Sequence, residues 1–453
     1  MSRKRLSVLL AALLSATCMT TLAAEDALTQ ALNTEGARVN LPVSAAKTPF
    51  DPLFIRQARG AFNNFHFQMG GDHALYYGLH LDNLLPTAEA APNPEFKAMQ
   101  RALRPELGDI QVTTAKGPLK LSDYAVSPQY RMQAMVMVHK GKVVYETYPG
   151  MAPDARHFSA STGKTLAGLV AALLVSEGKV DPKLPIVHYV PELKGTAWDQ
   201  VTTAQVLNMT TAMDNEETKA SIMQPDSAVV RYFASILGSP RATTGKSEDW
   251  LSVARDQQPL AGEKPGEHFR YASINTQVVT RLIENVEHKT FADVFAERVW
   301  SKVYARRSAA FALTPQGDAL PVGMVLITPE DFARFATLFT PSWSAVASEQ
   351  VVTPKVLDLI YQNVDPKRYN GTTKQQSSVD MFNDQAQGNA YQFDYIWSDG
   401  ALAKSGNLNQ MIYMDPKRDF AAVVFSSLPY HSGYGEFKAP AYLRAAAKQL
   451  AGF

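Results

Sequence analysis

An apolar segment in the first half of the chain places the tightest constraint on the fold. Its aliphatic residues recur at intervals of three and four positions, at Leu166, Leu169, Val170, Leu173 and Leu174. This spacing predicts an α-helix with one apolar face, and Gly178 is typical of a helix C-terminal end. We therefore expect a buried helix at the centre of the molecule.

Ser161 stands at the expected start of this helix, and Lys164 follows it by three positions. The lysine amine would then lie one turn away on the same face, where it can accept the proton of the serine hydroxyl. The positive end of the helix dipole adds to this effect. The alternative is a helix-capping serine and a surface lysine, because Ser-x-x-Lys is common by chance. Other segments of the chain are needed to decide between the catalytic and the structural interpretation.

The N-terminus has the order of features of a secretory signal peptide. Three basic residues within the first five precede an apolar run over residues 6–14 and a small-residue region over 21–24. We expect residues 1–23 to be removed and the protein to be periplasmic or secreted. Removing those three cations changes the net charge from +1 to −2, which gives no electrostatic support for nucleic-acid binding.

The cysteine content and the hydropathy of the chain exclude several classes of protein. Cys18 is the only cysteine and lies inside the predicted signal, so the mature chain would lack disulfides, a thiol nucleophile and cysteine metal sites. A lipid anchor at Cys18 is an alternative, but Ser15 stands where such a signal usually has leucine. No later segment has about 18 uninterrupted apolar residues, so we expect no stable membrane insertion after signal cleavage.

Residues 24–130 contain short apolar pieces separated by glycine and proline, and no motif emerges. We expect an N-terminal extension packed on the main body. His66, His73 and His80 recur every seven residues, but an intervening Gly-Gly pair interrupts any shared helix face. This pattern does not favour a metal site, and we predict none.

Residues 131–453 have the element pattern of an α+β domain. Two β-rich runs on either side of Lys140-Gly141 predict a hairpin. Thr328-Pro-Glu-Asp331 has the features of a helix start. Further elements are predicted at 202–209 (helix), 226–237 (helix), 291–303 (helix), 400–405 (strand), 410–414 (strand), 420–426 (strand) and 439–450 (helix). Strands near both ends predict a central antiparallel sheet flanked by helices, with an inserted, mostly helical lobe over about residues 181–290.

Two further segments carry reactive side chains. Tyr271 follows a Pro-Gly turn, in a loop that leads into an apolar helix expected from Gln277. Its phenol could pass a proton if a cation such as Lys164 raised its acidity, but by default it is a half-buried tyrosine. Lys404-Ser405-Gly406 precedes Asn407 at the end of a predicted strand. A glycine there permits close approach of a substrate to backbone N–H groups.

Taken together, these segments resemble a known signature. Ser161-Thr-Gly-Lys164, Tyr271-Ala-Ser273 and Lys404-Ser-Gly406 are similar, in order and separation, to the three motifs of serine β-lactamases and penicillin-binding proteins. The tyrosine resembles the class C branch. Residues 192–199, 207–210 and 269–276 look like those of 6-aminohexanoate-dimer hydrolases, and the resemblance covers roughly residues 130–453.

The resemblance implies a β-lactamase/transpeptidase-like fold with its site between the sheet and the helical lobe. It implies that Ser161 attacks a carbonyl, that Lys164 and Tyr271 share the acid and base roles, and that an acyl-enzyme forms. The N–H groups of Ser161 and Asn407 would bind the oxyanion. The remaining implied substrate-side residues are Ser273, Lys404, Ser405 and Gly406. The resemblance implies no metal or organic cofactor.

Two positions depart from the usual motifs, because Ser273 replaces an asparagine common in class C enzymes and Ser405 replaces a threonine. The preferred interpretation is an exported serine hydrolase that acts on a small-molecule ester or amide. The alternatives are a peptidoglycan D,D-peptidase or β-lactamase, and a non-catalytic binding or sensor protein on the same scaffold. The base is either a neutral Lys164 or a Tyr271 phenolate stabilised by a charged Lys164.

Overall fold

The computed structural model describes residues 36–429 and 436–452. The predicted signal peptide over residues 1–23 therefore lies outside the described residues. Among the residues that are described, no helix combines the length and the apolar character needed to cross a membrane.

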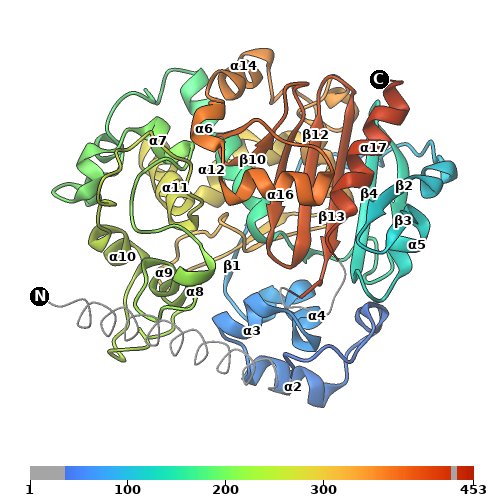
Figure 1. Cartoon of the computed structure of the whole chain (residues 1–453), viewed down its shortest axis with the longest axis horizontal. Helices are drawn as coiled ribbons and strands as arrows, with labels where there is room; N and C mark the ends of the chain where they lie inside the picture. Colours follow the sequence, from blue (N-terminus) through green and yellow to red (C-terminus); the bar gives the residue numbers. More distant parts are fainter. Residues whose placement is uncertain (1–35, 430–435, 453) are drawn as a thin grey trace, which may run out of the picture.

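A seven-stranded sheet with antiparallel neighbours forms the centre of the fold (Figure 1). Strands from the first half of the chain lie at one edge and pair with strands from its end, as the sequence predicted. In spatial order the strands are β5 (Lys142–Thr147), β4 (Met132–His139), β13 (Phe420–Ser426), β12 (Gln410–Asp415), β11 (Leu402–Gly406), β10 (Phe393–Ile396) and β9 (Gly388–Ala390).

The predicted hairpin is present as β4 and β5. Lys140 and Gly141 connect the two strands, with φ angles of 49° and 70°. Positive φ at both connecting residues matches the right-handed twist of the flanking strands, and Gly141 adopts it without a steric cost. The hairpin places β4 beside β13, where Val136 pairs with Val423.

Helices cover both faces of this sheet. On β4, Ala134, Val136 and Val138 belong to one apolar core, and Met135 and Met137 belong to the other. A strand buried on both faces is apolar at consecutive positions rather than alternating. The longer helices of the chain after β4 are α6 (Lys164–Ser176), α9 (Ala228–Ile236), α11 (Ser273–Glu287), α12 (Phe291–Arg298), α13 (Pro329–Thr337), α14 (Pro354–Gln362), α16 (Thr373–Phe382) and α17 (Ala439–Ala451).

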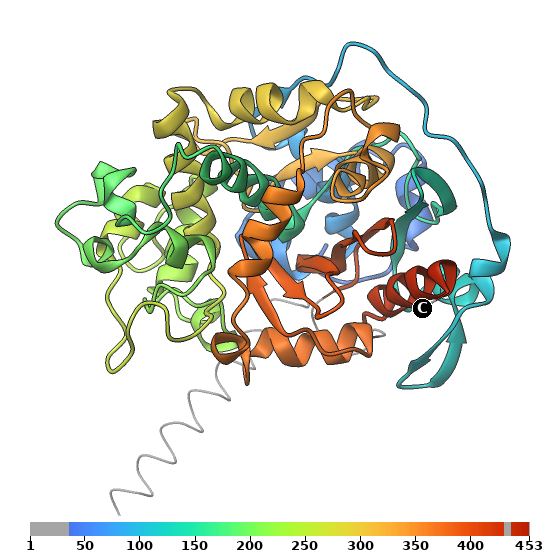
Figure 2. The same ribbon diagram turned by 90° about the horizontal axis from the view of Figure 1, so that it is seen from above.

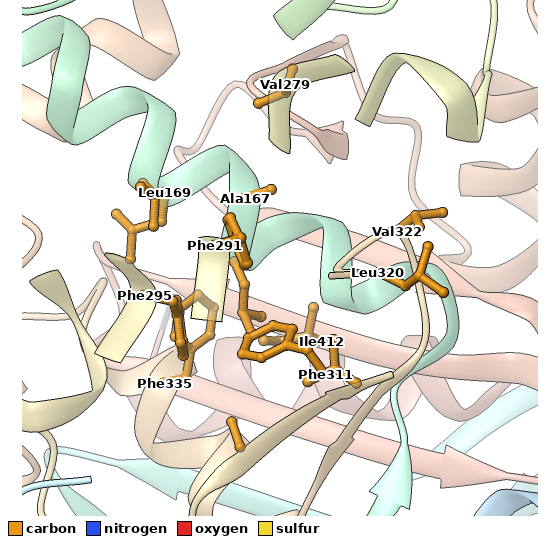
Figure 3. Packing of buried hydrophobic residues seen from close by; sticks show 14 of the residues in the cluster. Ala167, Leu169, Val279, Phe291, Phe295, Phe311, Leu320, Val322, Phe335 and Ile412 are labelled. Carbon is orange, nitrogen blue, oxygen red and sulfur yellow. The ribbon is translucent and has the colours of Figure 1, made fainter. Parts of the chain in front are cut away.

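Helix α6 is the buried helix that the apolar spacing predicted. Leu166, Leu169 and Leu174 are at most 1% exposed, and the helix packs against α11, α12, α14 and β10. Figure 3 shows its residues Ala167 and Leu169 beside phenylalanines of α12. The 3-10 turn η4 (Ala160–Gly163), which contains Ser161, immediately precedes this helix. The position of α6 therefore fixes the position of Ser161.

A second, four-stranded sheet contains the strand that precedes Ser161 in the chain. Its order is β1 (Thr87–Ala90), β7 (Ala309–Ala312), β8 (Val325–Ile327) and β6 (His157–Phe158). This sheet was not predicted from the sequence, because its strands are short and far apart along the chain. Its strand β6 ends just before the turn that carries the serine.

The N-terminal segment contacts several parts of the main body. Its strand β1 pairs with β7. The chain between β1 and the hairpin formed by β2 (Gln111–Thr114) and β3 (Gly117–Lys120) runs along the outside of the molecule (Figure 2). The predicted boundary near residue 130 stays a prediction. The elements of this segment are α2 (Pro52–Gly60), α3 (Asn64–Met69), α4 (Asp72–Leu79), β2 (Gln111–Thr114), β3 (Gly117–Lys120) and α5 (Leu121–Val126).

The region predicted as a helical lobe contains α9 and α11, and shorter helices fill the rest of it. They are α7 (Thr203–Leu207), α8 (Lys219–Ile222) and α10 (Trp250–Asp256), and α15 (Pro366–Tyr369) follows later in the chain. One boundary was wrong, because α11 begins at Ser273 rather than Gln277. The carboxylate of Glu217 accepts the Ser273 N–H, so this helix start is capped by a residue distant in sequence. The N-cap residue Ala272 makes no side-chain capping bond, so the local sequence does not indicate where α11 begins.

Candidate active site

Ser161 lies in a constrained turn. The preceding Ala160 has a left-handed φ of 45°, and the Thr162 hydroxyl donates to the Ser159 carbonyl at 2.6 Å. A Cβ on Gly163 would lie 2.6 Å from Ser159 Oγ, so only glycine fits this close approach. The turn holds Ser161 half-exposed at the start of α6.

Lys164 is fully buried beneath the serine. Its Nζ donates to Ser161 Oγ at 2.9 Å and to the Val322 carbonyl at 2.6 Å. Burial lowers the pKa of Lys164 to about 7, opposed by the carboxylate of Glu217 and reinforced by the ammonium of Lys404. Near neutral pH, a substantial fraction of Lys164 is therefore the neutral amine that can accept a proton.

Tyr271 lies near the same serine, and the Ser161 side chain acts to lower the pKa of its phenol. Burial raises the pKa of the Tyr271 phenol well above its ordinary value, and the carboxylates of Asp394 and Glu217 add to the increase. The phenol therefore stays protonated at neutral pH. Of the two bases that the sequence left open, this environment favours neutral Lys164.

The side-chain nitrogens of three lysines lie close to the ring of Tyr271. The Nζ atoms of Lys374, Lys404 and Lys164 lie 4.4, 4.5 and 5.4 Å from the ring centroid. Cations at such distances are attracted to the ring face. The ammonium groups of Lys374 and Lys404 therefore attract the ring, while the phenol itself stays protonated.

The third motif lies on β11, next to the serine turn. A Cβ on Gly406 would lie 2.9 Å from the Ser161 backbone nitrogen, so the strand backbone approaches the serine closely. Asn407 follows as the first residue of the turn η10 (Asn407–Asn409). The turns η4 and η10 are therefore in contact, and the Ser161 and Asn407 N–H groups are candidates to bind an oxyanion.

Lys404 points into an ion-pair network rather than toward solvent. Its ammonium and that of Lys374 both bind the buried carboxylate of Asp394, at 2.7 Å for Lys374. Lys374 Nζ also donates to Ser405 Oγ at 3.0 Å, and Ser405 lies 3.1 Å from the Tyr395 hydroxyl. Burial lowers the pKa of Lys404 to about 8, opposed by Asp394.

Asp394 stays ionised in this network. Although burial acts to raise its pKa, the ammonium groups of Lys374 and Lys404 hold it below the ordinary value. With both lysines charged, the three side chains carry one net positive charge beside Tyr271. The network therefore sets the local charge of the site.

Ser273 and Glu217 border the site on the side of the helical lobe. Ser273 is 2% exposed, in the first turn of α11. Glu217 holds this segment at two points, because its carboxylate accepts the Ser273 N–H and its own N–H donates to the Tyr271 carbonyl at 2.8 Å. Glu217 therefore fixes Tyr271 and also supplies a negative charge near Lys164.

The structure thus brings Lys164, Tyr271 and Gly406 close to Ser161, and it adds three residues that the motifs did not include. Asp394 had one usable signal, since it is an acid between Phe393 and Tyr395 in a short aromatic strand. Glu217 and Lys374 stand in polar segments that give no signal. Their roles depend on contacts between distant parts of the chain.

The described residues offer no group of three or more histidine, cysteine, aspartate or glutamate side chains suited to a metal ion. The three spaced histidines of the N-terminal segment fall on α3, on α4 and just after it. Among them, the rings of His66 and His73 have centroids 6.4 Å apart and meet edge to face. These rings pack against each other and against neighbouring aromatic residues.

Comparison with known proteins agrees with this geometry. The model of the beta-lactamase family matches residues 127–447. The chain belongs to the beta-lactamase family. It is 30% identical over 202 residues to the 6-aminohexanoate-dimer hydrolase of Paenarthrobacter ureafaciens, an alignment covering 44% of this chain and 50% of that protein. The chain spans about half the length of the curated relatives it matches.

Solved structures share the fold. A 6-aminohexanoate-dimer hydrolase homologue from Bacillus anthracis superposes with a TM-score of 0.64 at 21% identity, covering 83% of this chain and 92% of that one. EstCE1, a hydrolase with promiscuous acyltransferase activity, superposes with a TM-score of 0.51 at 14% identity, covering 73% and 96%. The family and the α+β fold expected from the three motifs are thereby confirmed.

Proposed function

We propose that this member of the beta-lactamase family is an exported serine hydrolase that cleaves small-molecule esters or amides through an acyl-enzyme on Ser161. One observation carries the proposal. The Lys164 amine lies 2.9 Å from the Ser161 hydroxyl, and burial lowers the pKa of that lysine to about 7. A serine hydroxyl becomes a useful nucleophile only beside such a base.

In the first half of the reaction, Ser161 Oγ bonds to the substrate carbonyl carbon and its proton passes to Lys164. The carbonyl oxygen becomes an oxyanion, which the N–H groups of Ser161 and Asn407 bind. When the intermediate collapses, the bond to the leaving oxygen or nitrogen breaks. The proton held by Lys164 then returns to the leaving group, with the Tyr271 hydroxyl beside it as the bridging donor.

In the second half, a water molecule replaces the leaving group. The water attacks the acyl carbon, and its proton passes to the regenerated Lys164 amine. The bond between the acyl carbon and Ser161 Oγ breaks, and the serine recovers its proton. The acid product leaves, and the enzyme returns to its starting state with all atoms accounted for.

Esters are the favoured substrates over β-lactams. An alkoxide leaves more readily than an amide nitrogen and needs less acid assistance from Tyr271. Ser273 stands where class C enzymes often have asparagine, and its side chain is buried at the start of α11. Rates measured on p-nitrophenyl esters, a D-amino-acid amide, a linear amide dimer and nitrocefin test this predicted preference for esters. A nitrocefin rate above the best ester rate would assign the protein to the β-lactamase alternative.

Covalent labelling tests the nucleophile directly. A fluorophosphonate probe is expected to label wild-type protein on Ser161 and to leave Ser161→Ala unlabelled. Ser176→Ala, at the far end of α6, is the matched control and should label like wild type. A label mapped to another residue contradicts the assignment.

Export is part of the proposal and rests on the basic, apolar and small-residue order of the N-terminus. The intact mass of the protein purified from its native host should correspond to a chain without about its first 23 residues. A mass that retains those residues contradicts export by this route.

A further inference from the structure

The turn η10, which carries Asn407, has an unfavourable backbone. Leu408 and Asn409 both adopt left-handed conformations, with φ angles of 53° and 67°. Residues with a side chain rarely adopt such angles unless surrounding contacts hold them there. The direction of the Asn407 N–H therefore depends on what fixes this turn.

One support comes from the central sheet. The Gln410 side chain donates to the carbonyls of Asn407 at 3.2 Å and Leu408 at 3.3 Å, and to that of Ser426 at 2.7 Å. Its oxygen accepts the Ser426 N–H at 3.0 Å. Gln410 thus ties the turn to β13.

The other support comes from the N-terminal segment, outside the residues matched by the family model. Asn407 Nδ2 donates to both the backbone oxygen and the side-chain oxygen of Gln68 on α3, each at 2.7 Å. A Cβ on Gly70, just after this helix, would lie 3.2 Å from a methyl group of Leu408. The segment therefore gives the turn a second support, in addition to Gln410.

The neighbouring residue on α3 contacts the serine side of the site. The rings of Phe67 and Phe158 have centroids 5.1 Å apart, and Phe158 ends β6 three positions before Ser161. Figure 1 places α3 at the end of the sheet, below β13. Consecutive residues of α3 thus contact Asn407 and the strand that leads to Ser161.

We propose that Gln68 is a positioning residue for the oxyanion hole and that the N-terminal segment is an integral part of the active site. The inference rests on the proposed function, because it assigns the Asn407 N–H to the oxyanion. Gln68 does not touch the reacting atoms. It fixes Asn407, so that the backbone N–H keeps its direction as negative charge develops.

The test compares two changes at one position. Gln68→Leu removes the side-chain acceptor and leaves the backbone acceptor of Gln68 in place, and kcat for the best ester is expected to fall about tenfold while KM stays within about threefold. Affinity for a boronic acid that forms a tetrahedral adduct should fall by the same factor, because the adduct places an oxygen in the oxyanion hole. Gln68→Glu keeps an acceptor and should restore most of kcat.

Two controls separate this effect from loss of folding. Gln100→Leu changes an exposed glutamine of the same N-terminal segment and should leave kcat and the melting temperature unchanged. Asn407→Asp removes the donor of the same contact while keeping the backbone N–H. Its combination with Gln68→Leu should be little worse than Asn407→Asp alone, because Asn407→Asp already removes the amide donor to both Gln68 oxygens.

A folded Gln68→Leu variant with wild-type kcat and wild-type boronate affinity overturns the inference, and so does a loss confined to KM. If Gln68→Leu does not fold, an Asn407→Asp variant with wild-type kcat and boronate affinity overturns it equally. Failure of the proposed function is a different result. In that case the fluorophosphonate probe would not label Ser161 in the wild-type protein.

Discussion

Lys404 and Asp394 form a buried ion pair between neighbouring strands of the central sheet, with side chains 0% and 1% exposed. The carboxylate also binds Lys374, so removing its charge leaves two lysines without their shared counter-ion. Breaking a buried ion pair on one side is costly, because the remaining charge stays desolvated.

Asp394→Asn is therefore expected to lower the free energy of unfolding by about 3 kcal/mol, measured by urea denaturation. Asp358→Asn, at an exposed position of α14, is the control and should change it by less than about 0.5 kcal/mol. Equal stability of the two variants would show that the network does not depend on the carboxylate charge.

The three central residues should act as one unit. Ser161→Ala, Lys164→Ala and Tyr271→Phe are each expected to lower kcat by roughly a thousandfold or more, and a double variant should be hardly worse than the singles. Melting curves must first show that each variant folds. Near-wild-type kcat in folded Tyr271→Phe on every substrate would make the second motif structural.

The pH profile should reveal the base. Lys164 accepts the serine proton only when neutral, and its pKa is lowered to about 7, so kcat/KM for an ester should rise with pH through an apparent pKa near 7. At pH 6 the value would be about a tenth of the plateau. A flat profile between pH 5 and 9 contradicts this role for Lys164.

Glu217 supplies an independent check of that pKa. Its carboxylate raises the pKa of Lys164, so Glu217→Gln should move the rising limb of the profile to lower pH. The amide oxygen can still accept the Ser273 N–H. Glu216→Gln is the matched control, because Glu216 pairs with Arg270 at 2.6 Å and should leave the limb in place.

Helix α6 tolerates no side chain at Gly168. A Cβ there would lie 2.2 Å from the Tyr391 carbonyl oxygen, so the helix and this backbone are in direct contact. Gly168→Ala should lower the free energy of unfolding by about 2 kcal/mol, although alanine usually stabilises a helix interior by about 1 kcal/mol. Gly60→Ala on α2, where nothing lies within 4 Å, should be neutral or stabilising in the same denaturation experiment.

Local patterns predicted part of the fold well. The apolar spacing located α6, the Lys140-Gly141 pair located the first hairpin, and Thr328 marked the start of α13. These features depend on interactions between residues a few positions apart. The sheet of β1, β7, β8 and β6 was not predicted, because short strands are defined by partners far along the chain.

By itself, the sequence determined which side chains are available for chemistry and in what order, because the spacing of Ser161 and Lys164 on one helical turn is a local property. Only the tertiary structure decided how they are charged and held. Burial lowers the pKa of Lys164, and Asp394, Glu217 and Gln68 reach the site from separate segments. Burial and electrostatic coupling depend on distances through space, which the chain acquires only when it folds.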